Sequence, residues 1–312
     1  MESSKFSVSP VITYNSEDIT LTSDYWANYK YVWGDEFNFG RINPYLWQYG
    51  SLLTTTDSTT KVTTYKDKEL VQVNDSGEAV FTVRYEDGAF YRAPDLHTKS
   101  TMNYKFGYIE MRAKLPFAKN AWSAFWMQSI VDNSNTLAST EANVYNSYKS
   151  EIDVFETFGR TDSFVSNLHK WYKVQSGTSE STYNEQLEEN DRVQYTFEGD
   201  ATSEYHIIGM EWTETYIKMF VDGVPYAYFE FTDDGKVCNK DGVALEFING
   251  YSGTDSPGAS VEGFLEPLLV VIGTGVANTN DPDLNSLPND YCIDWIRLYQ
   301  KNPVENSTIW TR

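Results

Sequence analysis

The feature that most restricts the fold of this chain is a long succession of short apolar or alternating segments, each bounded by turn residues. Residues 106–115 alternate between two sets of side chains, which is the period of a β-strand. Residues 121–128 are mostly apolar and aromatic, as in a strand that is covered on both faces. Asp222 and Gly223 separate two further segments, and Asp-Gly is a strong hairpin signal. No long amphipathic helix interrupts the series, so the sequence predicts an all-β sandwich or barrel.

The 312 residues are predicted to form one domain, because no linker and no internal repeat divides them. Residues 1–30 are polar with scattered aromatic residues, and we expect them to wrap the surface. Residues 31–300 are expected to form the domain and residues 301–312 a C-terminal tail. Residues 131–150 and 174–203 are long and polar, and we expect both to be loops at the rim of a functional site.

The charge and the aromatic content of the chain restrict its partners. The formal net charge of −21 argues against nucleic acid and against an anionic membrane surface. Aromatic residues make up 16% of the chain, and their flat rings offer surfaces on which sugars stack. No run of about 18 apolar residues is present, so we expect no membrane-spanning helix.

The sequence restricts the cellular location of the protein less than it restricts the fold. The chain begins Met-Glu-Ser-Ser-Lys without the apolar core of a signal peptide. This start fits either a cytoplasmic protein or one whose signal has been removed, and a polysaccharide substrate would favour the second. Cys238 and Cys292 are too few for a disulfide scaffold, and the sequence does not say whether they pair.

Three carboxylates lie within six residues, in the segment EIDVFE at positions 151–156. Apolar residues separate the acids, which favours a strand at a functional site over a solvated charge run. On a regular strand Glu151 and Asp153 share a face and Glu156 points the other way. One β-bulge between Asp153 and Glu156 would bring all three to one face.

With that bulge, the two glutamate Cα atoms would lie about 13 Å apart, four strand steps. Their side chains could then bring the carboxyl groups to about 5–6 Å, the separation of a retaining glycosidase. Two alternatives stay open on spacing alone: an acidic strand on a solvated sheet face, and a Ca²⁺ or Mg²⁺ site. None of His97, His169 and His206 has ligand spacing to another histidine.

Six segments, spread in order over about residues 31–300, resemble glycoside hydrolase family 16. EIDVFE matches the E-x-D-x-x-E motif of that family. The other five are WGDEFN (33–38), FGYIEMRAKLP (106–116), WSAFW (122–126), EWTETYIKMFVDG (211–223) and IDWIRLYQ (293–300). The resemblance implies a β-jelly roll of two curved antiparallel sheets, with a substrate cleft across the concave sheet.

The resemblance also implies roles for individual residues. Glu151 is expected to be the nucleophile, Glu156 the general acid/base, and Asp153 an electrostatic assistant to Glu151. The cleft positions that bind substrate are expected to be Glu110, Arg112, Trp122, Trp126, Asn167, His169 and Trp171. Three of these residues have a purely structural alternative. Arg112 could form a salt bridge to the triplet, and Trp122 and His169 could pack in the core.

No cofactor for catalysis is implied. The family often holds one structural Ca²⁺ on the convex side, and the matching positions are Asp294 through its side chain and backbone oxygens near Glu36 and Gly77.

The implied activity is that of an endo-acting, retaining hydrolase of internal β-linkages in a polysaccharide, either a β-glucan such as laminarin or a β-galactan. Several positions depart from the β-glucanase pattern: Tyr148-Lys149-Ser150 lack a tryptophan before the motif, Ser123 replaces a proline, and residues 271–278 replace a laminarinase segment. The alternatives are therefore a hydrolase of host O-glycan or poly-N-acetyllactosamine chains, a transglycosylase, and a non-catalytic carbohydrate-binding protein. We expect a monomer that is secreted, periplasmic or at the cell surface.

Overall fold

The computed structural model describes residues 26–130, 144–176, 179–198, 202–248 and 261–301. Within these ranges the chain forms two β-sheets and two short 3-10 helices, η1 (Lys68–Leu70) and η2 (Glu262–Leu265). Almost every strand pair is antiparallel, with β4 and β7 the parallel pair. The predicted all-β sandwich of two antiparallel sheets is confirmed.

One sheet has twelve strands, in the order β18-β17-β16-β15-β9-β21-β6-β7-β4-β3, with β1 paired to β21 and β5 to β6. Its strands are β1 (Lys30–Asp35), β3 (Thr55–Thr56), β4 (Thr63–Lys66), β5 (Val71–Val73), β6 (Ala79–Glu86), β7 (Ala89–Arg92), β9 (Gly107–Lys114), β15 (His206–Trp212), β16 (Tyr216–Val221), β17 (Val224–Phe231), β18 (Val237–Cys238) and β21 (Asn289–Gln300).

The other sheet has nine strands, in the order β19-β13-β12-β11-β10-β20-β8-β2, with β14 paired to β12. Its strands are β2 (Gln48–Tyr49), β8 (Leu96–His97), β10 (Ala121–Ser129), β11 (Val144–Glu156), β12 (Ser163–Ser176), β13 (Ser179–Leu187), β14 (Val193–Thr196), β19 (Phe247–Ile248) and β20 (Leu268–Val276).

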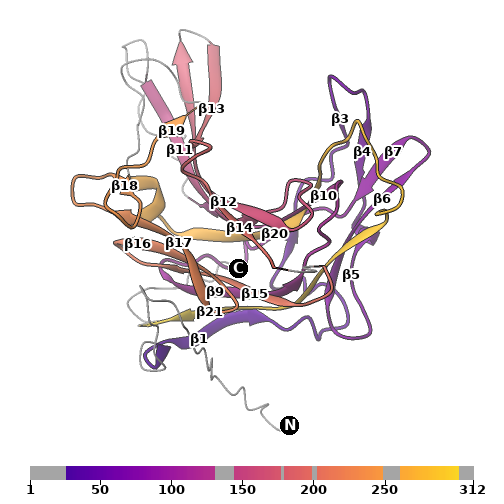
Figure 1. The fold of residues 1–312 in the computed structure, drawn as a ribbon, viewed down its shortest axis with the longest axis horizontal. Helices are drawn as coiled ribbons and strands as arrows, with labels where there is room; N and C mark the ends of the chain where they lie inside the picture. Colours follow the sequence, from indigo (N-terminus) through magenta and orange to yellow (C-terminus); the bar gives the residue numbers. More distant parts are fainter. Residues whose placement is uncertain (1–25, 131–143, 177–178, 199–201, 249–260, 302–312) are drawn as a thin grey trace.

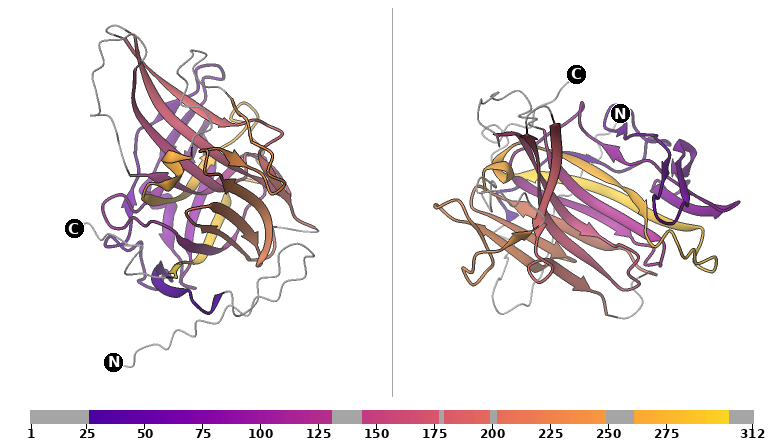
Figure 2. Two further views of the ribbon diagram at one scale, coloured as in Figure 1. Left: turned by 90° about the vertical axis from the view of Figure 1, so that its left-hand side faces the viewer. Right: turned by 90° about the horizontal axis from the view of Figure 1, so that it is seen from above.

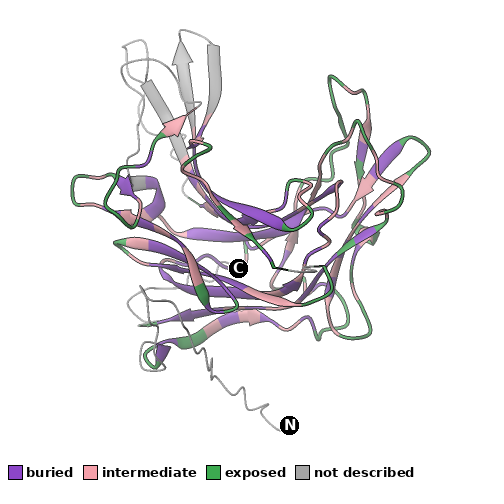
Figure 3. Ribbon diagram, viewed as in Figure 1, coloured by how far each residue is buried: buried purple, intermediate pink, exposed green. Residues whose placement is uncertain are grey.

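The two sheets bury one large hydrophobic core between them (Figure 3). Strand β9 shows how the sequence pattern builds it, because Ile109, Met111 and Ala113 are all buried in that core. The intervening Tyr108 and Glu110 therefore lie on the outer face of the twelve-stranded sheet. The strand period predicted for residues 106–115 is thus confirmed.

The ribbon curves around an open side (Figure 1). The far ends of β11, β12 and β13 rise on one side of the nine-stranded sheet, and β3, β4, β6 and β7 rise on the other. Figure 2 shows β11, β12 and β13 extending together beyond the sandwich, in agreement with their continuous antiparallel pairing.

Turn chemistry is confirmed at the predicted hairpin of residues 222–223. Asp222 and Gly223 both have positive φ, 48° and 79°, as a type I′ turn between β16 and β17 requires. Gly77, with φ 81°, closes the turn that joins β5 to β6. The side chain of Asp67 accepts a hydrogen bond from the backbone N–H of Glu69, which starts η1.

The loop prediction is wrong for residues 144–150 and for most of the described part of residues 174–203. Strand β11 already begins at Val144, and most of residues 174–203 belongs to β12, β13 and β14. Their polar composition hides the period of two that marks a strand in the sequence. In the structure β11 pairs with β12, and β12 pairs with β13. Residues 131–143 of the first segment lie outside the described residues.

A smaller cluster covers the outer face of the twelve-stranded sheet. Trp26 and Tyr29 pack there against three residues of the sheet, namely Tyr108, Phe220 and Tyr299. The end of the segment predicted to wrap the surface therefore contacts the domain, whereas residues 1–25 lie outside the described residues. The predicted boundaries at residues 31 and 300 stay predictions, although β1 begins at Lys30 and β21 ends at Gln300.

Cys238 and Cys292 are both free and buried, so the question of their pairing is answered. No helix within the described ranges is long and apolar enough to cross a membrane.

Candidate active site

The carboxylate triplet lies on β11, between β10 and β12. Asp153 pairs with Trp126 and Phe155 with Phe125, so the register with β10 skips Val154. The register with β12 also shifts between Asp153 and Glu156. The predicted β-bulge is therefore present, and it brings Glu156 to the face of Glu151 and Asp153.

The side chains between the acids explain why the bulge is stable. Ile152, Val154 and Phe155 are fully buried in the core between the sheets. Phe155 packs against the rings of Phe125 and Phe164, which anchors the bulged segment from below. The acids are thereby directed to the opposite face of the nine-stranded sheet.

Two tryptophans hold the outer acids. The indole Nε1–H of Trp122, on β10, donates to Glu156 Oε1 at 2.8 Å. The indole Nε1–H of Trp171, on β12, donates to Glu151 Oε2 at 3.0 Å. Both rings were predicted at the site, and the core alternative for Trp122 is wrong because its exposure is intermediate and its N–H reaches the acid.

Asp153 is the deepest acid, with 1% of its surface exposed. Its Oδ2 lies 2.8 Å from Nε2 of His169. That nitrogen is also 2.9 Å from the side-chain Nδ2 of Asn167, and His169 Nδ1 is 2.9 Å from Oδ1 of Asn184. His169 and Asn167 therefore lie beside the triplet as predicted, and His169 is bound to an acid and not to the core.

Burial controls the charge of the triplet. Desolvation, and then the charge of Asp153, raise the pKa of Glu156 to about 8, and the Trp122 N–H partly opposes them. Burial and then the Asp153 charge likewise raise the pKa of Glu151, with His169 and the Trp171 N–H lowering it. The pKa of Asp153 is raised by burial and lowered by its hydrogen bond with Glu156. A cluster with these properties shares protons near neutral pH, as an acid/base pair requires.

Glu110 and Arg112 do not belong to this site, and their prediction as cleft residues is wrong. They lie on β9, which pairs with β15 and β21 in the other sheet. Burial raises the pKa of Glu110 to about 7, and its carboxylate accepts a hydrogen bond from Tyr108. Arg112 binds Asp294 at 2.5 Å, so the alternative of a salt bridge to the triplet is also wrong.

The residues expected to hold Ca²⁺ lie on the outer side of the twelve-stranded sheet. The turn at Gly77 approaches the backbone oxygen of Phe37, because a Cβ added at Gly77 would lie 4.0 Å from it. The carboxylate of Asp294 is bound by Arg112, and that of Glu36 forms a two-bond pair with Arg297 at 2.8 Å. The expected side-chain ligand, Asp294, is thus paired with a guanidinium, as is the neighbouring Glu36, and this pairing does not fit a calcium ligand as it stands.

A second arrangement of possible metal ligands lies at the triplet itself. One ligand atom from each of Glu151, Asp153 and His169 falls within 4.8 Å of the others. Two of these atoms, Asp153 Oδ2 and His169 Nε2, lie 2.8 Å apart.

Several residues that shape the site were not predicted from the sequence. Asn184 lies on the polar strand β13, within a segment predicted to be a loop. The ring of Phe158 packs on Trp122 with 4.7 Å between centroids. Gly275 lies opposite Trp122 in the register of β10 and β20. Of these three residues, only Gly275 could have been predicted from the sequence, because a glycine inside a strand often marks a place where another group approaches the backbone closely.

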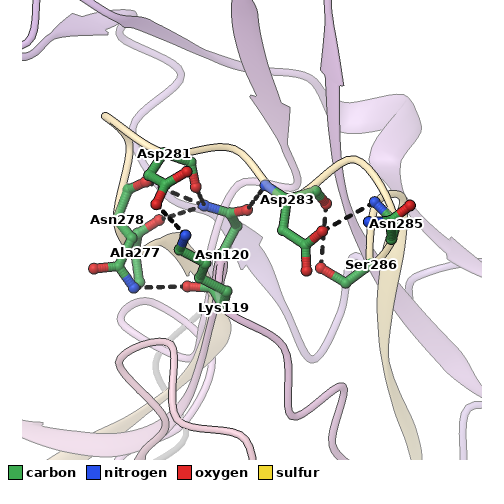
Figure 4. Close-up of polar contacts among 8 residues, drawn as sticks. All are labelled: Lys119, Asn120, Ala277, Asn278, Asp281, Asp283, Asn285 and Ser286. Carbon is green, nitrogen blue, oxygen red and sulfur yellow. Dashed lines mark hydrogen bonds and ion pairs between the residues drawn. The ribbon is translucent and has the colours of Figure 1, made fainter.

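Asn120 organises the loop that follows β20 (Figure 4). Its side-chain Nδ2 donates to the backbone oxygens of Ala277, Asn278 and Asp281 at 3.0–3.3 Å. Its Oδ1 accepts from the backbone N–H of Asp283 at 2.7 Å. Because Asn120 is two residues from Trp122, this loop is fixed at the Glu156 end of the triplet.

Fold and site together define a class: a β-sandwich protein that carries a bulged strand of three coupled carboxylates on the outer face of one sheet. The family model for glycosyl hydrolases family 16 matches residues 57–246. The chain belongs to glycoside hydrolase family 16.

Related proteins agree with this assignment. The chain is 26% identical to glucan endo-1,3-beta-glucosidase A1 of Niallia circulans, over 92% of this chain and 40% of that protein. It is 27% identical to a beta-glucanase of Rhodothermus marinus, over 66% of this chain and 68% of that protein. The chain therefore spans less than half of the first relative. The laminarinase structure from a Flavobacterium has the same fold, with TM-score 0.59, 20% identity, and coverage of 87% of this chain and all of that one.

Proposed function

We propose that this protein is an endo-acting, retaining glycoside hydrolase that cleaves internal β-linkages of a polysaccharide. The observation that carries the proposal is the β-bulge at residues 153–156, which gathers Glu151, Asp153 and Glu156 on one face. An acidic strand on a solvated sheet face would have no reason to bury Asp153 and to leave Glu151 and Glu156 only partly exposed beside it. A non-catalytic binding protein on this fold would have no use for both glutamates.

The proposed reaction has two steps. The carboxylate of Glu151 attacks the anomeric carbon, while Glu156 gives its proton to the glycosidic oxygen and the bond to the leaving sugar breaks. Glu156, now ionised, then takes a proton from water, and that water displaces Glu151 from the anomeric carbon. Two displacements at one carbon retain its configuration.

Asp153 supports both glutamates in this scheme. It lies between them on β11, and its hydrogen bond with Glu156 favours the protonated form of that glutamate. Its negative charge also raises the pKa of Glu151, and His169 opposes this effect. His169 lowers the pKa of both glutamates, so the proposed difference between them comes from two hydrogen bonds: the Trp171 N–H favours an ionised Glu151, and the bond with Asp153 favours a protonated Glu156.

The same sheet face offers groups for sugar binding. Trp122, Trp126 and Trp171 flank the triplet on β10 and β12, and all three have intermediate exposure. Their rings suit the apolar faces of sugars, whereas Asn167 and His169 suit hydroxyl groups near the reacting bond. We propose these five residues as substrate contacts.

A β-glucan is the proposed substrate class. Two relatives that match most of the chain, or two thirds of it, are named as a glucan endo-1,3-beta-glucosidase and a beta-glucanase. Some residues, such as Ser123, depart from the β-glucanase pattern. The type of linkage that is cleaved therefore has to be measured.

The test is release of reducing ends from a panel of polymers: laminarin, mixed-linkage β-glucan, agarose, and mucin-type O-glycan. We expect activity on a β-glucan, loss of at least about 10³-fold in Glu151→Gln, and an unchanged fold in that variant by circular dichroism. Activity confined to a galactan or to the O-glycan would overturn the substrate class. Binding of a polymer with no hydrolysis by the wild type would overturn the enzyme assignment.

A transglycosylase would be recognised in the same assay. It would yield products longer than the starting oligosaccharide when an acceptor is added, in place of reducing ends in proportion to the bonds broken.

The proposed location follows from the substrate. Polysaccharides do not cross membranes, so we propose that the protein acts in the periplasm, at the cell surface or outside the cell. A monomer is expected, and light scattering after size exclusion measures its mass.

Structural Ca²⁺ stays a prediction. A rise in melting temperature on adding Ca²⁺ that is lost in Asp294→Asn would support it. Melting curves that are identical in Ca²⁺ and in chelator would contradict it.

A further inference from the structure

We propose that Trp122 and Trp171 are positioning residues that act through their indole N–H groups, one on each glutamate of the catalytic pair. The inference rests on the proposed function, because it concerns the pH dependence of kcat/KM. It assigns the rise of activity at acidic pH to one tryptophan and the fall at alkaline pH to the other. It goes beyond sugar stacking, for which any large aromatic ring would serve.

The geometry is that of two donors on opposite sides of one strand. Trp122 reaches Glu156 from β10 at 2.8 Å, and Trp171 reaches Glu151 from β12 at 3.0 Å. Strands β10 and β12 are the two neighbours of β11. Each glutamate thus has one carboxylate oxygen held by a neutral N–H from its own side.

Both rings are held in place by their neighbours. Trp122 lies close against Gly275, where an added Cβ would be 2.8 Å from the ring atom Cε3, and its other side carries Phe158. Trp171 is nearly parallel to His169, with 16° between the planes and 6.5 Å between centroids. Neither tryptophan is part of the buried core between the sheets. Their fixed orientation therefore serves the face that carries the acids.

A neutral N–H donor stabilises the ionised form of a carboxylate and so opposes desolvation. At Glu151 the Trp171 bond lowers the pKa, which keeps the nucleophile ionised. At Glu156 the Trp122 bond lowers the pKa, which supports the ionised state reached after proton donation. The two bonds thus act on opposite limbs of a bell-shaped profile.

Tryptophan-to-phenylalanine variants separate this role from packing, because they keep an aromatic ring and remove the N–H. In Trp171→Phe the acidic limb of kcat/KM is expected to move to higher pH by about one unit. In Trp122→Phe the alkaline limb is expected to move to higher pH by a similar amount. Trp47 offers a matched control, because its N–H donates to the buried carboxylate of Asp35 at 2.8 Å far along the chain from the triplet. Trp47→Phe is expected to leave both limbs in place.

A second readout does not depend on activity. In protein labelled with ¹⁵N-tryptophan, the indole N–H resonance of Trp171 is expected to move with pH in wild type and to lose most of that movement in Glu151→Gln, in which Asp153 and His169 are the ionisable groups left beside it. The Trp122 resonance is expected to do the same in Glu156→Gln, whereas that of Trp47 is unaffected by either change.

The outcomes separate the two proposals. If no polymer is cleaved but both resonances follow their glutamates, the proposed function fails and the positioning role of the two indoles stands. Resonances of Trp122 and Trp171 that do not respond to Glu156→Gln and Glu151→Gln would overturn it. Phenylalanine variants that lower kcat at all pH values with unmoved limbs would also overturn it.

Discussion

Gly275→Ala tests how tightly the site is built, because it adds one methyl group beneath Trp122. The new Cβ would lie 2.8 Å from the ring atom Cε3 and 2.9 Å from Cδ2. Ordinary contact needs about 3.4 Å or more, so the indole must move by roughly 0.6 Å. If that movement is along the hydrogen bond, the distance from Trp122 Nε1 to Glu156 Oε1 grows from 2.8 Å to about 3.4 Å, beyond useful hydrogen bonding.

The expected cost has two parts. Overpacking of this kind costs about 1–3 kcal/mol of stability. Loss of the bond and a misplaced acid lower kcat/KM by about 10- to 100-fold. The assay is the pH dependence of kcat/KM on the best polymer of the panel, together with thermal unfolding of each variant.

Gly273→Ala is the matched control on the same strand. Its Cβ would meet Asp95, at 2.5 Å from Oδ1, and not Trp122. It is expected to lower stability by a similar amount and to leave kcat/KM within about threefold of wild type. If Gly275→Ala retains full activity, or if Gly273→Ala loses as much, then the indole does not hold Glu156 in the manner described.

Two further predictions concern stability. Burial raises the pKa of Glu156 to about 8 in the folded chain, so folding takes up a proton between about pH 4.5 and 8 and stability falls as pH rises through that range. Glu156→Gln removes the part of this dependence that Glu156 contributes, while Glu151 and Asp153 keep theirs, and chemical denaturation at pH 8.5 is expected to show the variant about 2 kcal/mol more stable than wild type. Equal stability of the two proteins at that pH would contradict the burial argument. Asn120→Ala removes two N–H donors and one oxygen acceptor that contact four backbone groups of residues 277–283, at about 1 kcal/mol for each of the three, and is expected to lower the melting temperature by about 5–10 °C. A melting temperature within about 1 °C of wild type would show that the loop does not depend on Asn120.

The sequence predicted the central geometry because a strand has a strict period of two. Glu151, Asp153 and Glu156 can share a face only through one extra residue, and the core placement of both Val154 and Phe155 shows where it lies. The same period puts Asn167 and His169 on one face of their strand, and the resemblance to family 16 placed that face beside the acids.

The sequence did not predict which sheet each strand joins. Alternation in residues 107–114 shows that Glu110 and Arg112 share a face, but it does not distinguish the outer face of one sheet from that of the other. Strand β9 pairs in the twelve-stranded sheet, and this long-range pairing separates both residues from the triplet.

The sequence also did not predict the strands that are mostly polar. Residues 144–150 and 179–187 lack an apolar face, so no hydrophobic pattern marks them as strands. Asn184, which bonds His169, was missed for this reason. The hydrogen bonds of Trp122 and Trp171 depend on ring orientation, which no residue pattern specifies.

The most direct test of the proposed double displacement is the configuration of the first product. Proton NMR of a fresh digest resolves the anomeric signals of the new reducing end before mutarotation. With Glu151 as nucleophile and Glu156 as acid/base, the β anomer appears first and the α anomer follows at the rate of mutarotation. An α anomer that appears first would show inversion, and the roles assigned to the two glutamates would be wrong.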